Sequence, residues 1–266
     1  MENPLILVAA IIIAIILIFG PFVFVNNLIL ASIRGAQIAL CRPAESRGDY
    51  MKAVCLVSGG PDSIIAAAEL KHEGFDVTAL CIDYGQLSSG EKAAAERLSK
   101  LLGFDFVYLD LSDLKKVMGV TSLVNPDLEI TPTFTDSIIV PNRNAILLSI
   151  GVALAYSINA DVVAYGAHAS DRRDYPDCRE EFIGFFQKAI QTATERKILV
   201  EAPNIKNSKA EVLLRGLELG VPLELTFSCY RNTAIHCGRC ESCRNRKAAF
   251  AEAGIKDKTV YENDKS

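Results

Sequence analysis

The sequence has no excess of basic residues, because 28 Lys and Arg stand against 32 Asp and Glu, for a net charge of -4. A protein that coats DNA or RNA must neutralise many phosphates, so this balance argues against a nucleic-acid partner. The 266 residues also contain no internal repeat and no low-complexity tract. A chain of this length accommodates one large domain or two small ones.

Charge is missing altogether between Glu2 and Arg34, and residues 5–19 are an unbroken apolar run. A membrane-spanning helix needs ~20 apolar residues, so residues 5–25 are a candidate transmembrane helix. A signal peptide fits poorly, since no basic residues precede the run. The arginines that follow it would keep the rest of the chain in the cytoplasm as a membrane-anchored domain. The alternative is that Met51 is the true start, because a strand is predicted directly after it.

Residues 28–50 have no clear period and resemble a linker, whereas residues 51–266 alternate strand-like and helix-like segments. Strands are predicted at 53–58, 76–83, 105–109, 161–166 and 198–201. Helices are predicted at 64–72, 90–102, 143–158, 180–195 and 209–219. Strands separated by helices form βαβ units, which predicts an α/β fold with a doubly wound parallel sheet and a cysteine-rich C-terminal segment.

The string Ser58-Gly59-Gly60-Pro61-Asp62-Ser63 lies between the first strand and the first helix. Helix N-termini expose unpaired N–H groups to anions, and two glycines let the backbone curl around a phosphate. The string matches neither G-x-x-x-x-G-K-[ST] nor G-x-G-x-x-G, which disfavours a Walker NTPase and a dinucleotide enzyme. We therefore predict a phosphate-binding loop rather than a plain turn with a capping side chain.

Four cysteines near the C-terminus form the pattern C-x7-C-x2-C-x2-C, made by Cys229, Cys237, Cys240 and Cys243. Four thiolates can close a tetrahedral zinc site, and such a site has no open position for chemistry. An iron–sulfur cluster is the alternative, since short C-x2-C spacings also occur in ferredoxins. Of the remaining cysteines, Cys55 and Cys81 lie in apolar strand-like runs, which favours core packing. Cys178 lacks an evident histidine partner, so we expect a pocket or packing role rather than a nucleophile.

The string SGGPDS resembles the pyrophosphate-binding loop (PP-loop) of the N-type ATP pyrophosphatases, whose fold is adenine nucleotide α-hydrolase-like. Three further strings, at 141–144, 166–171 and 175–179, together with the cysteine pattern, closely resemble the 7-cyano-7-deazaguanine synthase family. The resemblance covers nearly all of residues 52–254 and none of residues 1–50. It implies an ATP-dependent ligase that converts 7-carboxy-7-deazaguanine and ammonia to 7-cyano-7-deazaguanine, a precursor of queuosine and archaeosine.

The resemblance also implies roles for particular residues and cofactors. ATP with Mg²⁺ would be bound by Ser58, Gly59, Gly60, Pro61, Asp62, Ser63, Asp83 and Gln86. Contacts to the deazaguanine are expected from Arg143, His168, Asp171, Tyr175, Asp177 and Arg179. For His168 a structural role is as good an interpretation as a catalytic one. The four cysteines would hold a structural Zn²⁺ that fixes the C-terminal segment, with Arg244 and Arg246, over the active site. The chain would act on small molecules as a homodimer.

Two other functions compete with this prediction. Another enzyme of the same fold, such as a tRNA-thiolating one, would need a catalytic cysteine pair outside the quartet and a basic surface for tRNA. A membrane-anchored nucleotide sensor without turnover would keep the loop and show no ligase activity. Release of pyrophosphate from ATP, with and without the carboxylate and ammonium, separates the three.

Overall fold

A computed structural model describes residues 51–262 of the chain. The candidate transmembrane helix at 5–25 and the linker at 28–50 lie outside the described residues. Within them, Asp136–Ile158 is long and apolar enough to cross a membrane by length and composition. Its helical part packs on the sheet, where Leu148 and Ala155 are fully buried, as in the core helix of a soluble protein.

The core is a five-stranded sheet in which every strand pair is parallel, in the order β3-β2-β1-β4-β5. The strands are β1 Lys52–Leu56, β2 Asp76–Asp83, β3 Asp105–Asp110, β4 Val162–Ala164 and β5 Leu199–Glu201. The order reverses between β1 and β4, because β2 and β3 lie on one side of β1 and β4 and β5 on the other. Ligands of doubly wound sheets bind at the carboxyl ends of the strands next to such a switch point.

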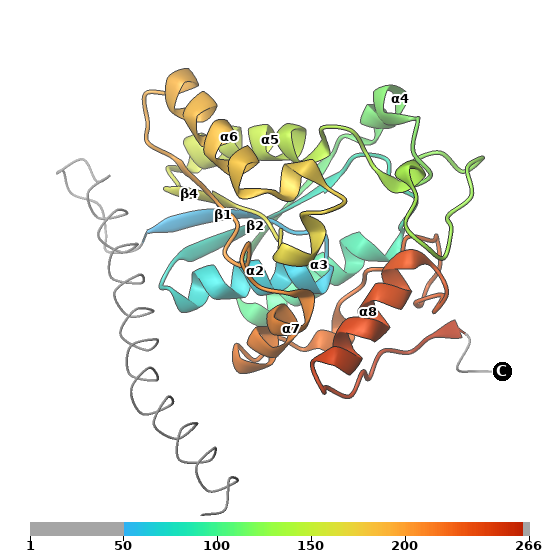
Figure 1. Cartoon of the computed structure of the whole chain (residues 1–266). Helices are drawn as coiled ribbons and strands as arrows, with labels where there is room; N and C mark the ends of the chain where they lie inside the picture. The colour runs from blue at the N-terminus through green and yellow to red at the C-terminus, as the bar shows by residue number, and fades with distance from the viewer. Residues whose placement is uncertain (1–50, 263–266) are drawn as a thin grey trace, which may run out of the picture. The chain divides into compact units, whose positions relative to one another are not determined.

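Helices cover both faces of this sheet (Figure 1). The longer ones are α2 Pro61–His72, α3 Gly90–Leu102, α5 Arg143–Ile158, α6 Glu180–Ala193, α7 Lys209–Glu218 and α8 Glu241–Glu252. Shorter helical turns are α4 Lys115–Met118 and 3-10 turns at Ser112–Leu114, Asp136–Ile138, Ala169–Asp171, Pro176–Cys178 and Leu223–Leu225. Figure 1 shows α5 and α6 on one face and α2, α3 and α7 on the other. The predicted α/β doubly wound fold is therefore confirmed.

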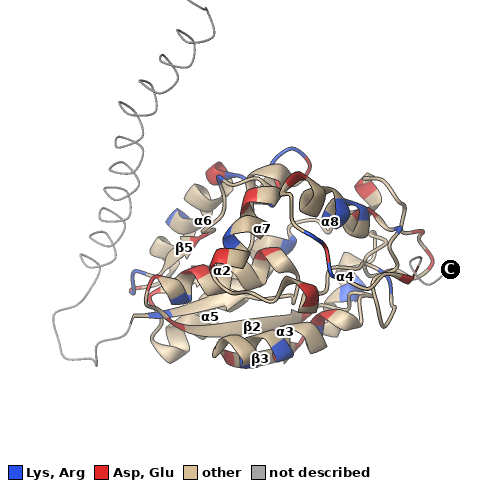
Figure 2. Ribbon diagram, turned by 90° about the horizontal axis from the view of Figure 1, so that it is seen from below, with Lys and Arg blue, Asp and Glu red and all other residues tan. Residues whose placement is uncertain are grey.

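Burial follows the layers of the fold. Strands β1 and β4 are covered on both sides, so Val54, Cys55 and Val163 have no exposed surface. Charged residues of both signs are spread along the outer helices and the loops, and the strands between them carry few (Figure 2). Parallel strands buried on both faces have continuous apolar sequences rather than alternating ones, which explains the runs AVCL and DVVA.

Candidate functional site

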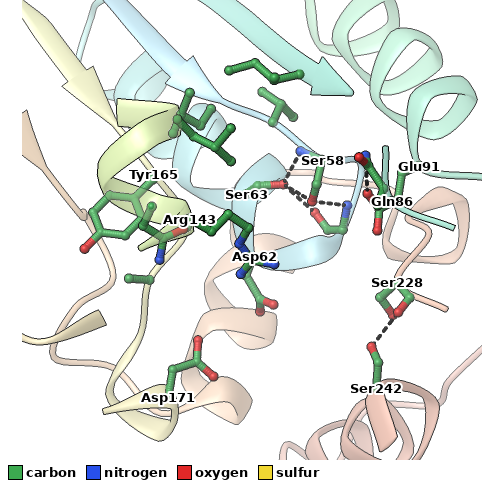
Figure 3. A pocket seen from close by; sticks show the side chains of 18 of the residues that line it. Ser58, Asp62, Ser63, Gln86, Glu91, Arg143, Tyr165, Asp171, Ser228 and Ser242 are labelled. Atoms are coloured by element: carbon green, nitrogen blue, oxygen red, sulfur yellow. Dashed lines mark hydrogen bonds between the residues drawn. The ribbon is translucent and has the colours of Figure 1, made fainter. Parts of the chain in front are cut away.

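The carboxyl ends of β1 and β4 open into a cavity of about 270 Å³. Of the predicted ATP-binding residues, Ser58, Gly60, Asp62, Ser63 and Gln86 line it (Figure 3). Of the predicted deazaguanine contacts, Arg143, Asp171 and Tyr175 line it. The structure thus brings both predicted groups to one cavity, at the point where the strand order reverses.

The phosphate loop connects β1 to α2 and is held by its own serines. The Ser63 hydroxyl donates to the Gly60 carbonyl at 3.1 Å and accepts from the Ser58 amide at 3.2 Å. Gly59 has φ +87°, and a Cβ there would lie 2.5 Å from the Glu91 carbonyl oxygen. Only glycine meets both conditions, because other residues rarely adopt this conformation and would also clash. Gly60 caps α2 without a side-chain hydrogen bond, so neither Asp62 nor Ser63 serves as the helix cap.

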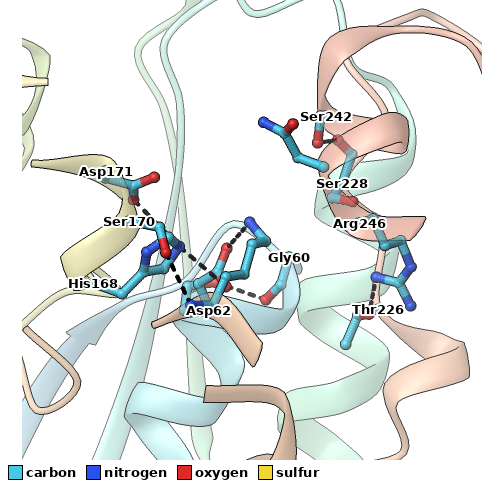
Figure 4. Close-up of polar contacts among 12 residues, drawn as sticks. Gly60, Asp62, His168, Ser170, Asp171, Thr226, Ser228, Ser242 and Arg246 are labelled. Carbon is cyan, nitrogen blue, oxygen red and sulfur yellow. Dashed lines mark hydrogen bonds and ion pairs between the residues drawn. The ribbon is translucent and has the colours of Figure 1, made fainter. Parts of the chain in front are cut away.

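Asp62 is the centre of a charged group at the start of α2. Its Oδ2 accepts from the Lys209 ammonium at 3.0 Å, and its Oδ1 lies 3.6 Å from His168 Nε2 (Figure 4). The same His168 nitrogen lies 3.4 Å from Asp171 Oδ2. Burial alone would raise the pKa of Asp62, but Lys209 and then His168 outweigh it and hold that pKa well below its usual range. Asp62 is therefore ionised beside the loop, and burial raises the pKa of Asp171 in contrast.

Several atoms of this group have no hydrogen-bond partner among the described residues. They are Asp62 Oδ1 and both ring nitrogens of His168, all of them buried. His168 is 1% exposed and does not line the cavity, so it lies behind Asp62 rather than facing the solvent side. Buried polar groups are nearly always paired in folded proteins, and an unpaired carboxylate oxygen at a cavity wall is suited to a cation or a ligand donor.

Other predicted site residues hold the backbone instead of facing the cavity. Asp83 accepts from the Gly85 amide at 2.8 Å and from the Tyr108 hydroxyl at 3.1 Å. Asp177 accepts from the Asn144 amide at 3.2 Å in the first turn of α5. Arg179 donates to the Arg172 carbonyl at 2.9 Å and is exposed. These contacts shape the turns on which Gln86 and Arg143 are placed.

The cavity also has lining residues that the sequence analysis did not single out. Lys209, at the start of α7, is 147 positions from Asp62 in the chain, so no local pattern connects them. Glu91, at the start of α3, accepts from the Gln86 amide at 3.2 Å, and burial raises its pKa to about 7. Ser228 and Ser242 come from the cysteine-rich segment, which comprises residues 227–246, and the Ser242 hydroxyl donates to the Ser228 carbonyl.

The four cysteines of the C-terminal pattern meet in one buried cluster. Their sulfur atoms all lie within 4.8 Å of one another, and each side chain is at most 1% exposed. Gly238 makes the tight turn inside Cys237–Cys240 with φ +72°, and the Cys240 amide donates to Cys237 Sγ at 3.3 Å. Four soft sulfur donors at this spacing, with backbone N–H groups aimed at them, can hold one metal ion and leave no open position.

Arg246 does not reach over the cavity, contrary to the prediction from the sequence. It is 1% exposed and donates to Thr226 Oγ1 at 2.8 Å, to the Leu223 carbonyl at 2.7 Å and to Thr259 Oγ1. It therefore joins α8 to the chain on either side of the cysteine cluster. Arg244 is exposed and does not line the cavity.

The predicted roles of the other cysteines agree with their burial. Cys55 and Cys81 are core residues of β1 and β2, and burial raises the pKa of each thiol to about 12. Cys178 lines the cavity, and its sulfur accepts from the Asn144 side chain at 3.6 Å. Burial also raises the pKa of Cys178, so its thiol is neutral and a weak nucleophile.

Comparison with known proteins places these features in a family. The family model "Queuosine biosynthesis protein QueC" matches residues 52–254. The chain is 40% identical over 217 residues to the 7-cyano-7-deazaguanine synthase of Caldicellulosiruptor bescii, covering 80% of this chain and 98% of that protein. It is 42% identical over 220 residues to that of Methanospirillum hungatei, covering 79% and 100%. Among solved structures, an NMN synthetase from Francisella tularensis is similar, with 17% identity, a TM-score of 0.46 and coverage of 78% and 79%. The chain belongs to the QueC family of queuosine biosynthesis proteins.

Proposed function

We propose that this protein is an ATP-dependent carbon–nitrogen ligase that makes 7-cyano-7-deazaguanine from 7-carboxy-7-deazaguanine and ammonia. The main observation behind the proposal is that one cavity is lined by the phosphate loop, by Arg143 and by Asp171. Family membership over nearly the whole length of the relatives supports the same reaction.

The chemistry requires two activations of one carbon atom. A carboxylate is a poor acylating agent, because its leaving group would be oxide. Its oxygen attacks the α-phosphorus of ATP, pyrophosphate leaves, and the resulting acyl adenylate accepts ammonia with loss of AMP and a proton. The amide oxygen then attacks the α-phosphorus of a second ATP, and pyrophosphate and one N–H proton leave. Loss of the second N–H proton and departure of AMP give the nitrile.

The phosphate loop is proposed to hold the pyrophosphate group during both activations. The first turn of α2 exposes unpaired N–H groups, and the helix dipole favours an anion there. Ser58 and Ser63 add hydroxyl donors on the same side. The Lys209 ammonium, held at 3.0 Å by Asp62, supplies a positive charge beside the loop. Asp62 is ionised and lines the cavity, where a carboxylate suits a Mg²⁺ ion that accompanies ATP.

Arg143 and Asp171 are proposed to bind the two ends of the deazaguanine. Arg143 donates to the Tyr84 hydroxyl at 3.3 Å from the start of α5 and lines the cavity, where its charge matches the substrate carboxylate. Asp171 lines the same cavity. A carboxylate there can accept from the N–H groups of a guanine-like edge. The predicted contacts from His168, Tyr175, Asp177 and Arg179 remain predictions, and the contacts described above favour positioning roles for His168, Asp177 and Arg179.

The four cysteines are proposed to bind one zinc ion with a structural role. The cluster is closed and buried, which suits a structural ion. Cysteine thiolates need a reducing compartment, which supports a cytoplasmic catalytic domain.

We also propose that residues 51–266 form this domain and that residues 1–50 are either a membrane anchor or an added start. A protein that begins at Met51 should then be soluble and active. If residues 51–266 contain the dimer interface, this protein should also form a homodimer.

The test measures pyrophosphate, AMP and nitrile in four mixtures: ATP alone, ATP with the carboxylate, ATP with ammonium, and all three together. Ligase activity predicts two pyrophosphates and two AMP per nitrile, and only in the complete mixture. Pyrophosphate release that needs a tRNA and a sulfur donor would instead identify a thiolating enzyme. Binding of ATP without release in any mixture would identify a sensor.

A further inference from the structure

The cysteine-rich segment contacts the phosphate loop directly through one backbone hydrogen bond. The Phe227 amide donates to the Gly59 carbonyl at 2.8 Å, although the two residues are 168 positions apart. Phe227 comes two positions before the first cysteine of the cluster and lines the cavity. This bond joins the proposed phosphate site to the segment that holds the four cysteines.

The bond determines which way the peptide between Gly59 and Gly60 faces. In a trans peptide the C=O and N–H groups point in opposite directions. Because the Gly59 carbonyl points to Phe227, the Gly60 amide points the other way and donates to Ser58 Oγ at 3.3 Å, on the cavity side. Rotation of this peptide would turn the carbonyl toward the anion. Glycines on both sides leave that rotation sterically easy, so an external donor is needed to prevent it.

Phe227 is in turn held by the cysteine cluster and by α3. Its ring packs so closely on Gly90 that a Cβ there would lie 2.6 Å from ring atoms. The His236 ring packs against it with the ring centroids 4.7 Å apart and the ring planes tilted by 43°, and His236 Nε2 accepts from the Ser228 amide at 3.2 Å. The Ser88 hydroxyl donates to the backbone carbonyl of Cys229, the residue after Ser228, at 2.8 Å. The position of the Phe227 amide is therefore set by residues that belong to the metal-binding segment.

We propose that Phe227 is a positioning residue that keeps the Gly59–Gly60 peptide oriented for phosphate, so that the cysteine-rich segment sets the affinity of the loop for ATP. The proposal rests on ATP binding by the loop, and it does not depend on which acceptor the adenylate is transferred to. It assigns the segment a defined effect on the active site through one backbone N–H group.

The experiment compares Phe227→Pro with Phe227→Ala in the metal-loaded protein. Both substitutions remove the ring, but only proline removes the N–H donor. Binding of inorganic pyrophosphate and of Mg–ATP is measured by calorimetry, with metal content and Tm determined on the same samples. Phe227→Pro should bind pyrophosphate about tenfold more weakly than Phe227→Ala, as expected for a lost hydrogen bond that orients a phosphate donor. Metal content should be the same in both.

A second variant covers the case in which proline prevents folding. Replacing Phe227 by its α-hydroxy acid, phenyllactic acid, turns the N–H into an ester oxygen and keeps the ring on Gly90. Its affinity for pyrophosphate should fall by about the same factor, while Tm moves by only a few degrees. Equal affinity in the ester and the wild type overturns the proposal. If the wild-type protein binds neither pyrophosphate nor Mg–ATP, the proposed function fails with it. If binding follows the pattern above but no nitrile forms, only the proposed ligase reaction fails.

Discussion

The Asp62–His168 group beside the phosphate loop and Arg246 in the cysteine-rich segment differ in how well their polar atoms are paired. In the loop region, Asp62 Oδ1 and the His168 ring are buried with no hydrogen-bond partner among residues 51–262. In the cysteine-rich segment, the equally buried Arg246 guanidinium donates to two threonine hydroxyls and one carbonyl. Both regions contribute to the wall of one cavity, through Asp62 on one side and Ser242 on the other.

This difference separates a group beside the ligand cavity from a contact that joins elements of the fold. Within the cysteine-rich segment, Ser228, which lines the cavity, also has a buried hydroxyl without a partner, so the contrast applies to Arg246 and not to every residue of the segment. An unpaired buried polar group costs about 1–3 kcal/mol, so it persists where a ligand completes its bonds. A fully paired buried charge needs no ligand, and its removal leaves its partners unsatisfied. Substitutions in the loop should therefore change activity more than stability. Substitutions in the segment should do the reverse, except at the Phe227 contact.

The largest effect is expected from Cys240→Ser. Loss of one thiolate would remove one of the four ligands of the proposed zinc site, and structural zinc contributes on the order of 10 kcal/mol in small zinc-binding peptides. The variant should lose most of its metal and melt at least about 10 °C lower, with activity falling as a consequence. Metal analysis and thermal melting followed by circular dichroism measure both. Cys81→Ala, which removes another buried thiol, is the matched control and should keep the metal.

The same samples identify the metal. A colourless protein with one zinc per chain supports the proposal, whereas iron, sulfide and absorbance near ~400 nm would indicate a cluster. A metal-free protein that is stable and active would contradict both. In that last case, the contrast between the two regions would lose its main support.

The next largest effect, on activity alone, is expected from Asp62→Ala. Removing the carboxylate releases Lys209 and takes away the proposed Mg²⁺ contact, so kcat/KM should fall by about 10³-fold, or about 4 kcal/mol. Stability should change by less than about 1 kcal/mol, because the ion pair with Lys209 is partly exposed. Steady-state kinetics and urea unfolding measure the two quantities. Asp113→Ala removes an exposed carboxylate far from the loop in sequence and should change neither.

The sequence was sufficient for the fold because each buried strand and its following helix have a strong local pattern. Strand β2 and helices α3 and α5 have the predicted bounds, whereas β4 is shorter than predicted, at Val162–Ala164 instead of 161–166. The position of the 58–63 loop and the meeting of the four cysteines were also predictable, since each set lies in one short stretch of sequence. Phosphate binding by the loop and zinc binding by the cysteines stay predictions from residue type and spacing.

Side-chain direction and long-range pairing were not predictable in the same way. Asp83 and Asp177 stand in strings typical of the family, yet their carboxylates accept backbone amides. A motif cannot show whether a carboxylate faces a ligand or caps a turn, because both uses favour the same residue. Lys209 reaches Asp62 only through the packing of α7 on α2, and the Phe227 amide has no side-chain signature at all.

A smaller effect, on stability alone, is expected from Arg246→Met. Methionine fills much of the volume but removes the donor to two buried threonine hydroxyls, while the Leu223 carbonyl keeps the Thr226 amide and hydroxyl. We expect the free energy of unfolding to fall by about 3 kcal/mol, with kcat/KM unchanged in the folded protein. Arg244→Met, two positions earlier and exposed, should change stability by less than about 0.5 kcal/mol. Reduced kcat/KM at normal stability would return Arg246 to the active site and weaken the contrast.

The smallest effect is a pH dependence of stability that comes from Glu91, in the cavity beside the loop. Burial raises its pKa from the ordinary 4.5 to about 7. The folded state therefore holds the proton more tightly than the unfolded state, and Glu91 contributes stability at pH 4.5 and below that is lost as the pH rises to about 7. Because the side chain is only partly buried and accepts from Gln86, solvent screening reduces the effect to about 1 kcal/mol. Glu91→Gln should match the wild type near pH 5 and exceed it by that amount at pH 8, as measured by urea unfolding at both pH values. Glu96→Gln, on the exposed side of the same helix, is the control. If Glu91→Gln raises the free energy of unfolding by the same amount at pH 5 and pH 8, ionisation of the Glu91 carboxyl is not what destabilises the wild-type protein.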